Sequence, residues 1–342
     1  METKSATQNG KRERIAILIL SVLLFVLFIF SFVIGRYDVP VTDVIKILLS
    51  RVFPITQNWT SNMETAVINI RLPRILLACL VGCCLATAGT SYQSVFQNPM
   101  AAPDILGASS GACFGAALAI LFDFSKMGIT LTAFFFSILT VTLVYIIGAR
   151  IRGNQIVNIL LAGIMVSSLF SAGTSYIKLV ADPSNQLPAI TYWLMGSLSG
   201  TRLKDVGFAV IPMLIGLAPI FLIRWRMNLL TINEEEAKSM GVNTKLLRFA
   251  VIVCATFITA ASVACSGMIG WVGLVIPHLS RKIVGNNCRY LIPASMIFGA
   301  FFLLLVDNIS RNLLATEIPI GILTAFIGAP FFIYLMMQKE NH

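Results

Sequence analysis

The chain has 342 residues, of which 57% are hydrophobic and only 12% are charged, whereas soluble domains carry about 25% charged residues. A membrane-spanning helix needs about 20 apolar residues, so about nine or ten such helices would use nearly all the hydrophobic residues of this chain. Too few would be left for separate soluble cores, which excludes a two-domain cytoplasmic enzyme. The net charge of +10 comes from short basic clusters between apolar runs. This pattern is typical of loops in a membrane protein and argues against nucleic-acid binding.

The first apolar run, Ile15–Ile34, follows Lys11, Arg12 and Arg14 and resembles the start of a signal peptide. Because it is long enough to cross a bilayer and is followed by Gly35-Arg36-Tyr37 without a small-residue cleavage site, we expect a retained span. The N-terminus, residues 1–14, is then a cytoplasmic tail.

Hydropathy predicts further spans along the rest of the chain. They are Leu72–Gln93, Ile105–Phe122, Gly128–Ile147, Ile156–Ile177, Val206–Ile223, Leu246–Cys265, Trp271–Val284, Leu291–Val306 and Ile318–Met337. The prediction is an all-α, polytopic membrane protein with about ten transmembrane helices and both termini cytoplasmic. Residues 15–337 form a single transmembrane domain, and residues 338–342 form a cytoplasmic tail.

Two segments between spans have a pattern of their own. Residues 41–51 have apolar positions at helical spacing after a Thr or Asp cap, which predicts an amphipathic helix on the outer surface. The polar segment Ala181–Leu187 precedes Tyr192 and Trp193, which suit the aromatic belt at a membrane interface.

The chain lacks the residues that several kinds of site require. Its seven cysteines show no CxxC spacing, so neither a disulfide framework nor a metal site is predicted. Apart from Asp307, the predicted spans hold no Asp, Glu or Lys at mid-depth, where ion-coupled transporters place such groups. No GxxxxGK[ST] motif occurs, so any nucleotide chemistry must belong to a separate protein.

Small residues recur at every fourth position in two of the predicted spans. Gly107, Gly111 and Gly115 form one series, and Gly82 with Ala86 forms another. Such residues let helix backbones approach closely, so we expect close helix packing at both series.

A third series, Gly163, Ser167, Ser171 and Ser175, forms a small or polar stripe. Close packing would explain it, and hydroxyls that line a wet pathway would explain it equally well. Both readings stay open at this point.

The motif Arg71-Leu72-Pro73-Arg74 breaks two rules at once. Proline suits the first turn of a helix, so the second span is predicted to begin here. Its arginines then lie at the positive end of the helix dipole and on the outer side of the membrane. Both placements are unfavourable, and each costs about 0.3–1 kcal/mol. An acidic partner explains them better than snorkelling to lipid phosphates. A third outer arginine, Arg311, either pairs with Asp307 four residues earlier or has the same external role.

The longest cytoplasmic loop holds a predicted short helix. Asn233 is a preferred N-cap, three glutamates follow in the first turn, and Gly241 is a natural stop. Such a helix could transmit force to a soluble partner, or it could be a solvated connector.

These residues resemble the permease subunits of iron-chelate and cobalamin ABC importers, the FecCD family, over nearly the whole chain. The resemblance rests on several motifs in order: Arg71-Leu72-Pro73-Arg74, residues 97–107 (QNPMAAPDILG), residues 236–241 (EAKSMG), residues 270–278 (GWVGLVIPH), and EIPIG at 317–321 with GAP at 328–330.

The resemblance implies a permease domain over residues 15–337 in the cytoplasmic (inner) cell membrane, as a homodimer or close heterodimer. It also implies two partners: ABC ATPase subunits, which hold ATP and Mg while this chain binds no cofactor, and an extracytoplasmic substrate-binding protein. The residues that match the family's sites are, for docking of the binding protein, Arg71, Arg74 and Arg311; for coupling to the ATPase, Glu234, Glu235, Glu236, Ala237, Lys238, Met240 and Gly241; and for the cytoplasmic gate, Asn98, Pro99 and Met100.

The resemblance makes a ferric siderophore the expected cargo, with cobalamin or heme as alternatives. The cobalamin permease has hydroxyl residues near its inner constriction, where this chain has Ile156 and Val157, which disfavours cobalamin slightly. The rival from another class is an ion-coupled secondary transporter. It requires a mid-membrane ionisable residue or a pair of broken helices, and Gly267–Gly273 matches the second requirement only in part.

Overall fold

The computed structural model describes residues 2–51, 53–54, 56–153, 155–230, 239–314 and 316–339, and every regular element within these ranges is helical. In chain order the elements are α1 (Glu2–Val33), α2 (Val41–Leu49), α3 (Ser61–Glu64), η1 (Thr65–Arg71), α4 (Leu72–Val95), η2 (Pro103–Leu106), α5 (Ala108–Leu121), α6 (Lys126–Arg150), α7 (Gln155–Val180), α8 (Gln186–Leu194), α9 (Leu203–Ile223), η3 (Arg226–Leu230), α11 (Thr244–Ser266), α12 (Val272–Val284), α13 (Cys288–Asn312) and α14 (Ile320–Lys339).

The all-α prediction is confirmed for the described residues, and each predicted span overlaps a helix. By length and composition, seven helical segments in the described ranges could cross a membrane. They are α1, the continuous run formed by α3, η1 and α4, and the single helices α6, α7, α9, α11 and α13. The apolar helices α5 and α14 are shorter. The chain is therefore a multi-pass membrane protein, while the count of ten spans and the cytoplasmic position of the termini stay predictions.

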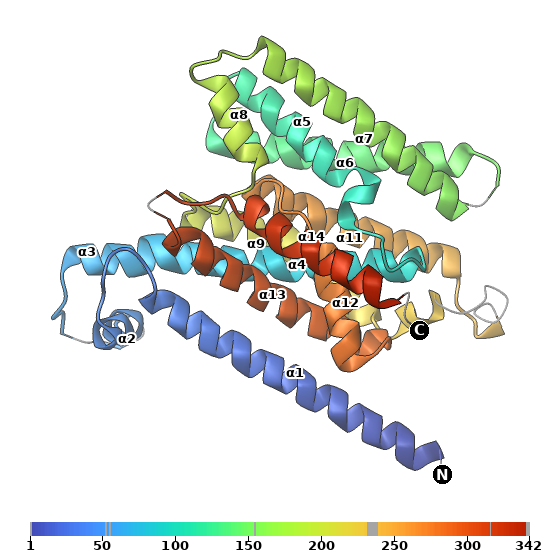
Figure 1. The fold of residues 1–342 in the computed structure, drawn as a ribbon, viewed down its shortest axis with the longest axis horizontal. Helices are drawn as coiled ribbons and strands as arrows, with labels where there is room; N and C mark the ends of the chain where they lie inside the picture. Colours follow the sequence, from blue (N-terminus) through green and yellow to red (C-terminus); the bar gives the residue numbers. More distant parts are fainter. Residues whose placement is uncertain are drawn as a thin grey trace.

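The helices form two groups, and both ends of the chain lie at one end of the molecule (Figure 1). We call this end the termini end and the opposite one, which carries α2 and α3, the distal end. Helices α5, α6, α7 and α8 form one group, and the remaining long helices surround α4. Helix α11 contacts α5 and α6 as well as α4 and α9, so it joins the two groups.

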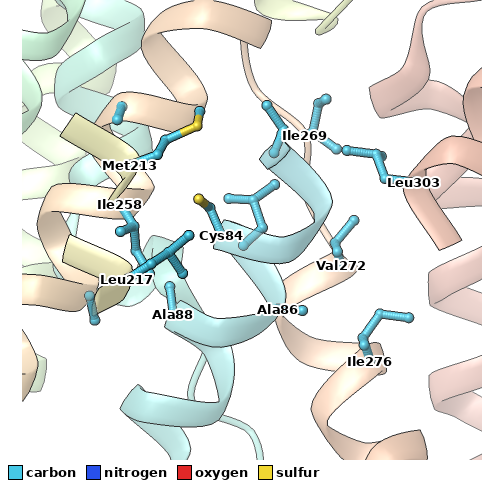
Figure 2. Close-up of a cluster of buried hydrophobic side chains, with 14 of the residues drawn as sticks. Cys84, Ala86, Ala88, Met213, Leu217, Ile258, Ile269, Val272, Ile276 and Leu303 are labelled. Carbon is cyan, nitrogen blue, oxygen red and sulfur yellow. The ribbon is translucent and has the colours of Figure 1, made fainter. Parts of the chain in front are cut away.

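Helix α4 forms the centre of the larger group. Nearly all of its side chains are buried, and Figure 2 shows three of them, Cys84, Ala86 and Ala88, among apolar residues of α9, α11, α12 and α13. Cys84 and Ala88 lie near Met213 and Leu217 of α9 in this view. Its buried polar residues, among them Thr87 and Thr90, donate to backbone carbonyls of the same helix, so their enclosure leaves these hydroxyl groups bonded.

The glycine series confirm the prediction of close helix packing. A Cβ atom on Gly82 of α4 would lie only 2.2 Å from the carbonyl oxygen of Gly299 on α13. On Gly111 and Gly115 of α5, a Cβ would lie 2.1 Å from Thr140 Oγ1 and 2.6 Å from the carbonyl oxygen of Thr132, both on α6. No larger residue fits these contacts without moving a helix.

The expected amphipathic helix over residues 41–51 is present as α2, with Val44 and Ile47 on its buried face. Its N-cap differs from the prediction. Pro40 occupies the N-cap position and makes no side-chain cap, because its ring carries no oxygen that could accept a hydrogen bond from the first amides of the helix.

The α-helix α4 begins at Leu72 with Pro73 in its first turn, as predicted, but it continues an earlier helical run and does not start a new one. The helical run begins at Ser61 and continues through the π-helix η1 into α4. The amide of Leu72 donates to the carbonyl of Val67, five residues back, and such a widened turn accommodates Pro73 without ending the helix. Both arginines therefore lie inside a helix, away from its positive end.

Candidate functional site

Four charged side chains form a cluster near the distal end of α4 and α13. Arg74 Nε donates to Asp307 Oδ1 at 2.8 Å, and Arg74 Nη1 donates to Glu317 Oε2 at 2.8 Å. Arg311 Nε lies 3.7 Å from Asp307 Oδ2. Asp307 is fully buried, whereas the Glu317 side chain is 28% exposed. In this arginine–carboxylate cluster, burial is tolerated because each charge has an opposite charge beside it.

The neighbouring arginines bind carbonyl oxygens at the ends of helices. Arg71 donates to the carbonyls of Phe32 and Tyr37, at and just beyond the C-terminal end of α1. Arg311 Nη2 donates to the carbonyl of Ser31 at 3.0 Å, and Arg36 Nε donates to that of Arg311 at 3.1 Å. The last carbonyls of a helix have no partner within it and carry its negative dipole end, so guanidinium groups stabilise them.

The structure brings Arg71, Arg74 and Arg311 close together, as expected for three residues that are predicted to form one docking site. Their side chains are buried, however. They are 4%, 6% and 7% exposed, respectively. From the sequence, acidic partners were expected for these arginines. The structure supplies two acidic residues from the same chain, Asp307 and Glu317. The pair between Arg311 and Asp307 is confirmed as a contact. Docking of another protein on these arginines stays a prediction.

The predicted gate residues Asn98, Pro99 and Met100 form an exposed turn between α4 and η2. Asn98 Oδ1 accepts a hydrogen bond from the Met100 amide at 2.9 Å, and its carbonyl accepts from the Ala101 amide at 3.0 Å. This geometry explains the Asn-Pro pair as a turn former. A gating role for the turn stays a prediction.

Beyond this turn, η2 carries a carboxyl group, that of Asp104. Its side chain is open at the surface, but the closely packed ends of α4, α5 and α7 around it desolvate the carboxyl and raise its pKa. A hydrogen bond from the Ser109 hydroxyl acts in the opposite direction and lowers that pKa.

Most of the predicted coupling helix lies outside the described residues, namely Glu234, Glu235, Glu236, Ala237 and Lys238. Of the remaining two, Met240 is exposed and Gly241 has a φ of 75°. A positive φ favours glycine and agrees with the predicted helix stop at Gly241.

Two side chains that the sequence did not single out connect this region to the helix bundle. Gln97 Nε2 donates to the carbonyl of Leu230 at 2.6 Å, which joins the gate turn to the end of η3. Asn228 Oδ1 accepts from the Cys288 amide at 2.7 Å, and Asn228 Nδ2 donates to Asn287 Oδ1 at 3.0 Å. The segment that precedes the predicted coupling helix is therefore tied to α4 and to the start of α13.

The predicted stripe on α7 divides into two halves. A Cβ on Gly163 would lie 2.2 Å from the carbonyl oxygen of Ile105, and Ser167 Oγ is buried without a hydrogen-bond partner. Ser171 and Ser175 are exposed. Positions four apart on a helix rotate by about 40° per step, so one stripe faces two environments. Close packing is confirmed for Gly163, and a pathway role for the stripe stays a prediction.

A hollow of about 560 Å³ opens between α8, the start of α12 and α14. Met195, Met268, Trp271 and Phe326 are among its lining residues, and all the described residues that line it are uncharged. Thioether and aromatic groups adapt to bulky apolar surfaces.

Comparison with known proteins gives a consistent result. A model of the FecCD transport family matches residues 23–338. The molybdate import system permease MolB of Haemophilus influenzae is 40% identical over 94% of this chain and 95% of its own length. A Helicobacter pylori permease named for an iron chelatin transport system is 41% identical over 82% of this chain and 85% of its own length.

A solved structure described as an inward-facing conformation of a metal-chelate type ABC transporter is also similar. It is 38% identical to this chain, with a TM-score of 0.85, and the match covers 94% of this chain and 98% of the solved chain. The helix arrangement described above is therefore shared with that transporter.

Replacing Asp307 by Asn should destabilise the protein strongly. It leaves Arg74 and Arg311 buried beside a neutral group, and breaking a buried pair from one side lowers stability by about 3–5 kcal/mol. The control is Asp43→Asn, whose carboxylate lies 3.6 Å from Lys46 on α2 with both side chains partly exposed. It should change stability by less than about 1 kcal/mol. Unfolding of both variants in detergent measures the difference, and equal losses would contradict a stabilising cluster.

Proposed function

Because this chain belongs to the FecCD transport family of ABC importer permeases, we propose that it carries a metal chelate through the cytoplasmic membrane, with a ferric siderophore as the preferred cargo. Cobalamin or heme is the alternative within the same architecture. The transport step requires no covalent chemistry in this chain, so the proposal concerns recognition and movement.

The observation that carries the choice of cargo is the apolar hollow between α8, α12 and α14. Pores for bare anions are lined by Arg or Lys, and a molybdate ion would need such donors. The described lining of the hollow holds Met195, Met268, Trp271 and Phe326 and no charge. These side chains suit a bulky chelate whose metal is enclosed by organic groups, which supports a ferric chelate over the molybdate named for MolB.

The energy and the cargo are proposed to come from separate proteins. The chain has no phosphate-binding loop, so ATP and Mg belong to partner ATPase subunits at the termini end. A substrate-binding protein docks at the distal end. A second copy of the permease covers the exposed apolar face of α7, which includes Ile164, Met165 and Leu169.

Docking on Arg71, Arg74 and Arg311 has to take account of their burial. We infer that an acidic side chain of the binding protein replaces Glu317, the partly exposed carboxylate of the arginine–carboxylate cluster. Arg74 Nη2 is buried and has no hydrogen-bond partner within the described residues, so it could bind an incoming carboxylate. The exchange would keep the charge of Arg74 paired throughout.

Coupling is proposed to run through the two tethers at the termini end. The ATPase moves the segment 234–241, and Gln97 transmits this motion to the gate turn at Asn98, Pro99 and Met100. Asn228 transmits it to α13. Opening of the pathway is then a rigid-body switch of helices, in which Gly163, Ser167, Ser171 and Ser175 line the route.

Reconstitution tests the proposed function directly. Vesicles that contain the permease with its ATPase and binding protein should accumulate a ferric siderophore only when ATP is present, and the permease alone should move nothing. Excess molybdate should not compete with the siderophore. Uptake without the ATPase would contradict the importer mechanism, whereas competition by molybdate would contradict the choice of cargo.

The exchange at Glu317 predicts opposite effects of two substitutions. Glu317→Gln removes the internal competitor and should tighten binding of the loaded binding protein by about tenfold, while Arg74→Gln should weaken it by a similar factor. Binding is measured on immobilised permease. The matched control is Glu64→Gln, which removes a partly exposed carboxylate, paired with Arg51 at 2.7 Å, at the same end. Equal effects of the two Glu→Gln changes would exclude the exchange.

The tether at Gln97 predicts uncoupling. Gln97→Ala should lower uptake per ATP hydrolysed by between about twofold and thirtyfold, because it removes one link in the path between the ATPase and the gate. ATP hydrolysis itself should continue. Gln57→Ala, at an exposed residue of the loop between α2 and α3, serves as the control. Unchanged stoichiometry in Gln97→Ala would remove this side chain from the coupling path.

A further inference from the structure

A pocket that is lined by both polar and apolar residues lies between α8, the start of α6 and the end of α11. Its volume is about 480 Å³. The polar residues that line it include Asp123, Lys126, Tyr192, Ser199 and Ser266. None of these residues has a place in the docking, coupling or gating arguments above.

An apolar groove of about 240 Å³ adjoins this pocket. Its walls come from α6, α9 and α11 and include Phe134, Phe208, Ile211 and Phe257. Thr130, Ala264 and Cys265 line both the pocket and the groove, so the two spaces lie side by side. The helices that form the groove are all long and apolar enough to cross a membrane.

The charges around the pocket are unequal. Lys126 Nζ donates to Asp205 Oδ2 at 2.6 Å and to the carbonyl of Gly200 at 2.9 Å, which leaves one of its three donors available. Asp123 is exposed, and among the residues that the structure describes its carboxylate accepts one long hydrogen bond, of 3.4 Å, from Gln186 Nε2. The pocket therefore offers a nearly free carboxylate and a lysine whose charge is already balanced.

We propose that the pocket and groove together bind one phospholipid with a zwitterionic head group that carries a primary ammonium, as in phosphatidylethanolamine. The ammonium pairs with Asp123. The phosphate accepts hydrogen bonds from the remaining donor of Lys126 and from the hydroxyl groups of Tyr192 and Ser199. One acyl chain lies in the groove along α6, α9 and α11.

The combination of shapes and charges selects this ligand class. A pocket with polar groups that adjoins an apolar groove between membrane helices fits an amphiphile, and the surrounding bilayer supplies one at high concentration. An anionic head group would meet the free carboxylate of Asp123 without an available balancing cation, since Asp205 already pairs with Lys126. The adjacent Tyr192 and Trp193 are the residue types that favour the head-group level of a membrane.

This inference does not depend on the proposed cargo or on the importer mechanism. The experiment uses the purified full-length permease in detergent, with phosphatidylethanolamine and phosphatidylglycerol added separately. Native mass spectrometry measures the bound lipid, and thermal unfolding measures the stabilisation that each lipid gives. We expect phosphatidylethanolamine to bind and stabilise at lower concentration than phosphatidylglycerol.

Two variants separate the head-group site from the chain site. Asp123→Asn should weaken phosphatidylethanolamine by about tenfold, as expected for loss of one charge-assisted contact, and should tighten phosphatidylglycerol, because it removes the like charge that opposes an anionic head group. Asp43→Asn is its control. Thr130→Phe blocks the junction and should abolish retention of either lipid, while Thr142→Phe, at an exposed position three turns further along α6, should not.

Several outcomes would overturn the proposal. Equal or tighter binding of phosphatidylglycerol would exclude the zwitterionic head group. Identical behaviour of Asp123→Asn and Asp43→Asn would exclude the pairing with the ammonium. Identical behaviour of Thr130→Phe and Thr142→Phe, with both variants folded as judged by gel filtration, would exclude the groove as the site of the acyl chain.

Discussion

The close contact of α4 and α13 determines where the charged groups of this protein can meet. Gly82 and Gly299 place the two backbones so near that no Cβ atom fits between them. Without a hydrophobic driving force between helices in lipid, such contact supplies the dispersion energy that holds them together. At one end of this contact Asp307 comes within reach of Arg74, and at the other Ser94 Oγ lies 3.6 Å from Cys288 Sγ.

Helical content and close packing followed from local sequence because lipid leaves the backbone few alternatives. A segment in hydrocarbon must satisfy its own amides and carbonyls, so long apolar runs become helices whatever their neighbours are. Small residues at every fourth position then mark where neighbours approach. The helical run from Ser61 that precedes α4 did not follow from the sequence, because the rule that places proline in the first turn describes an isolated helix end. The preceding turn widens into η1 and continues the helix instead.

The charged site could be found from the sequence only as an anomaly. Arg71 and Arg74 violate the charge rules for an outer helix end, which indicated that partners exist but not where they lie. The partners of Arg74 are more than 230 residues away in the chain. Arg71 binds backbone carbonyls, which have no signature in the sequence. The contact between Gln97 and Leu230 could not be predicted from the sequence either, because its acceptor is also a backbone carbonyl.

The burial of α4 limits how this protein can change shape. Because α4 is packed on all sides, bending it alone would break many of its buried contacts. One end holds the arginine–carboxylate cluster, and the other continues into Gln97 and the gate turn. A shift of α4 and α13 must therefore occur against the group of α5, α6 and α7. These groups meet where α11 contacts α5 and α6, for example where the ring of Phe257 on α11 packs edge-on against that of Phe134 on α6, with 5.3 Å between the ring centroids. Because these aromatic side chains interlock, the boundary cannot slide continuously, and a shift between the groups has to pass between discrete packed arrangements.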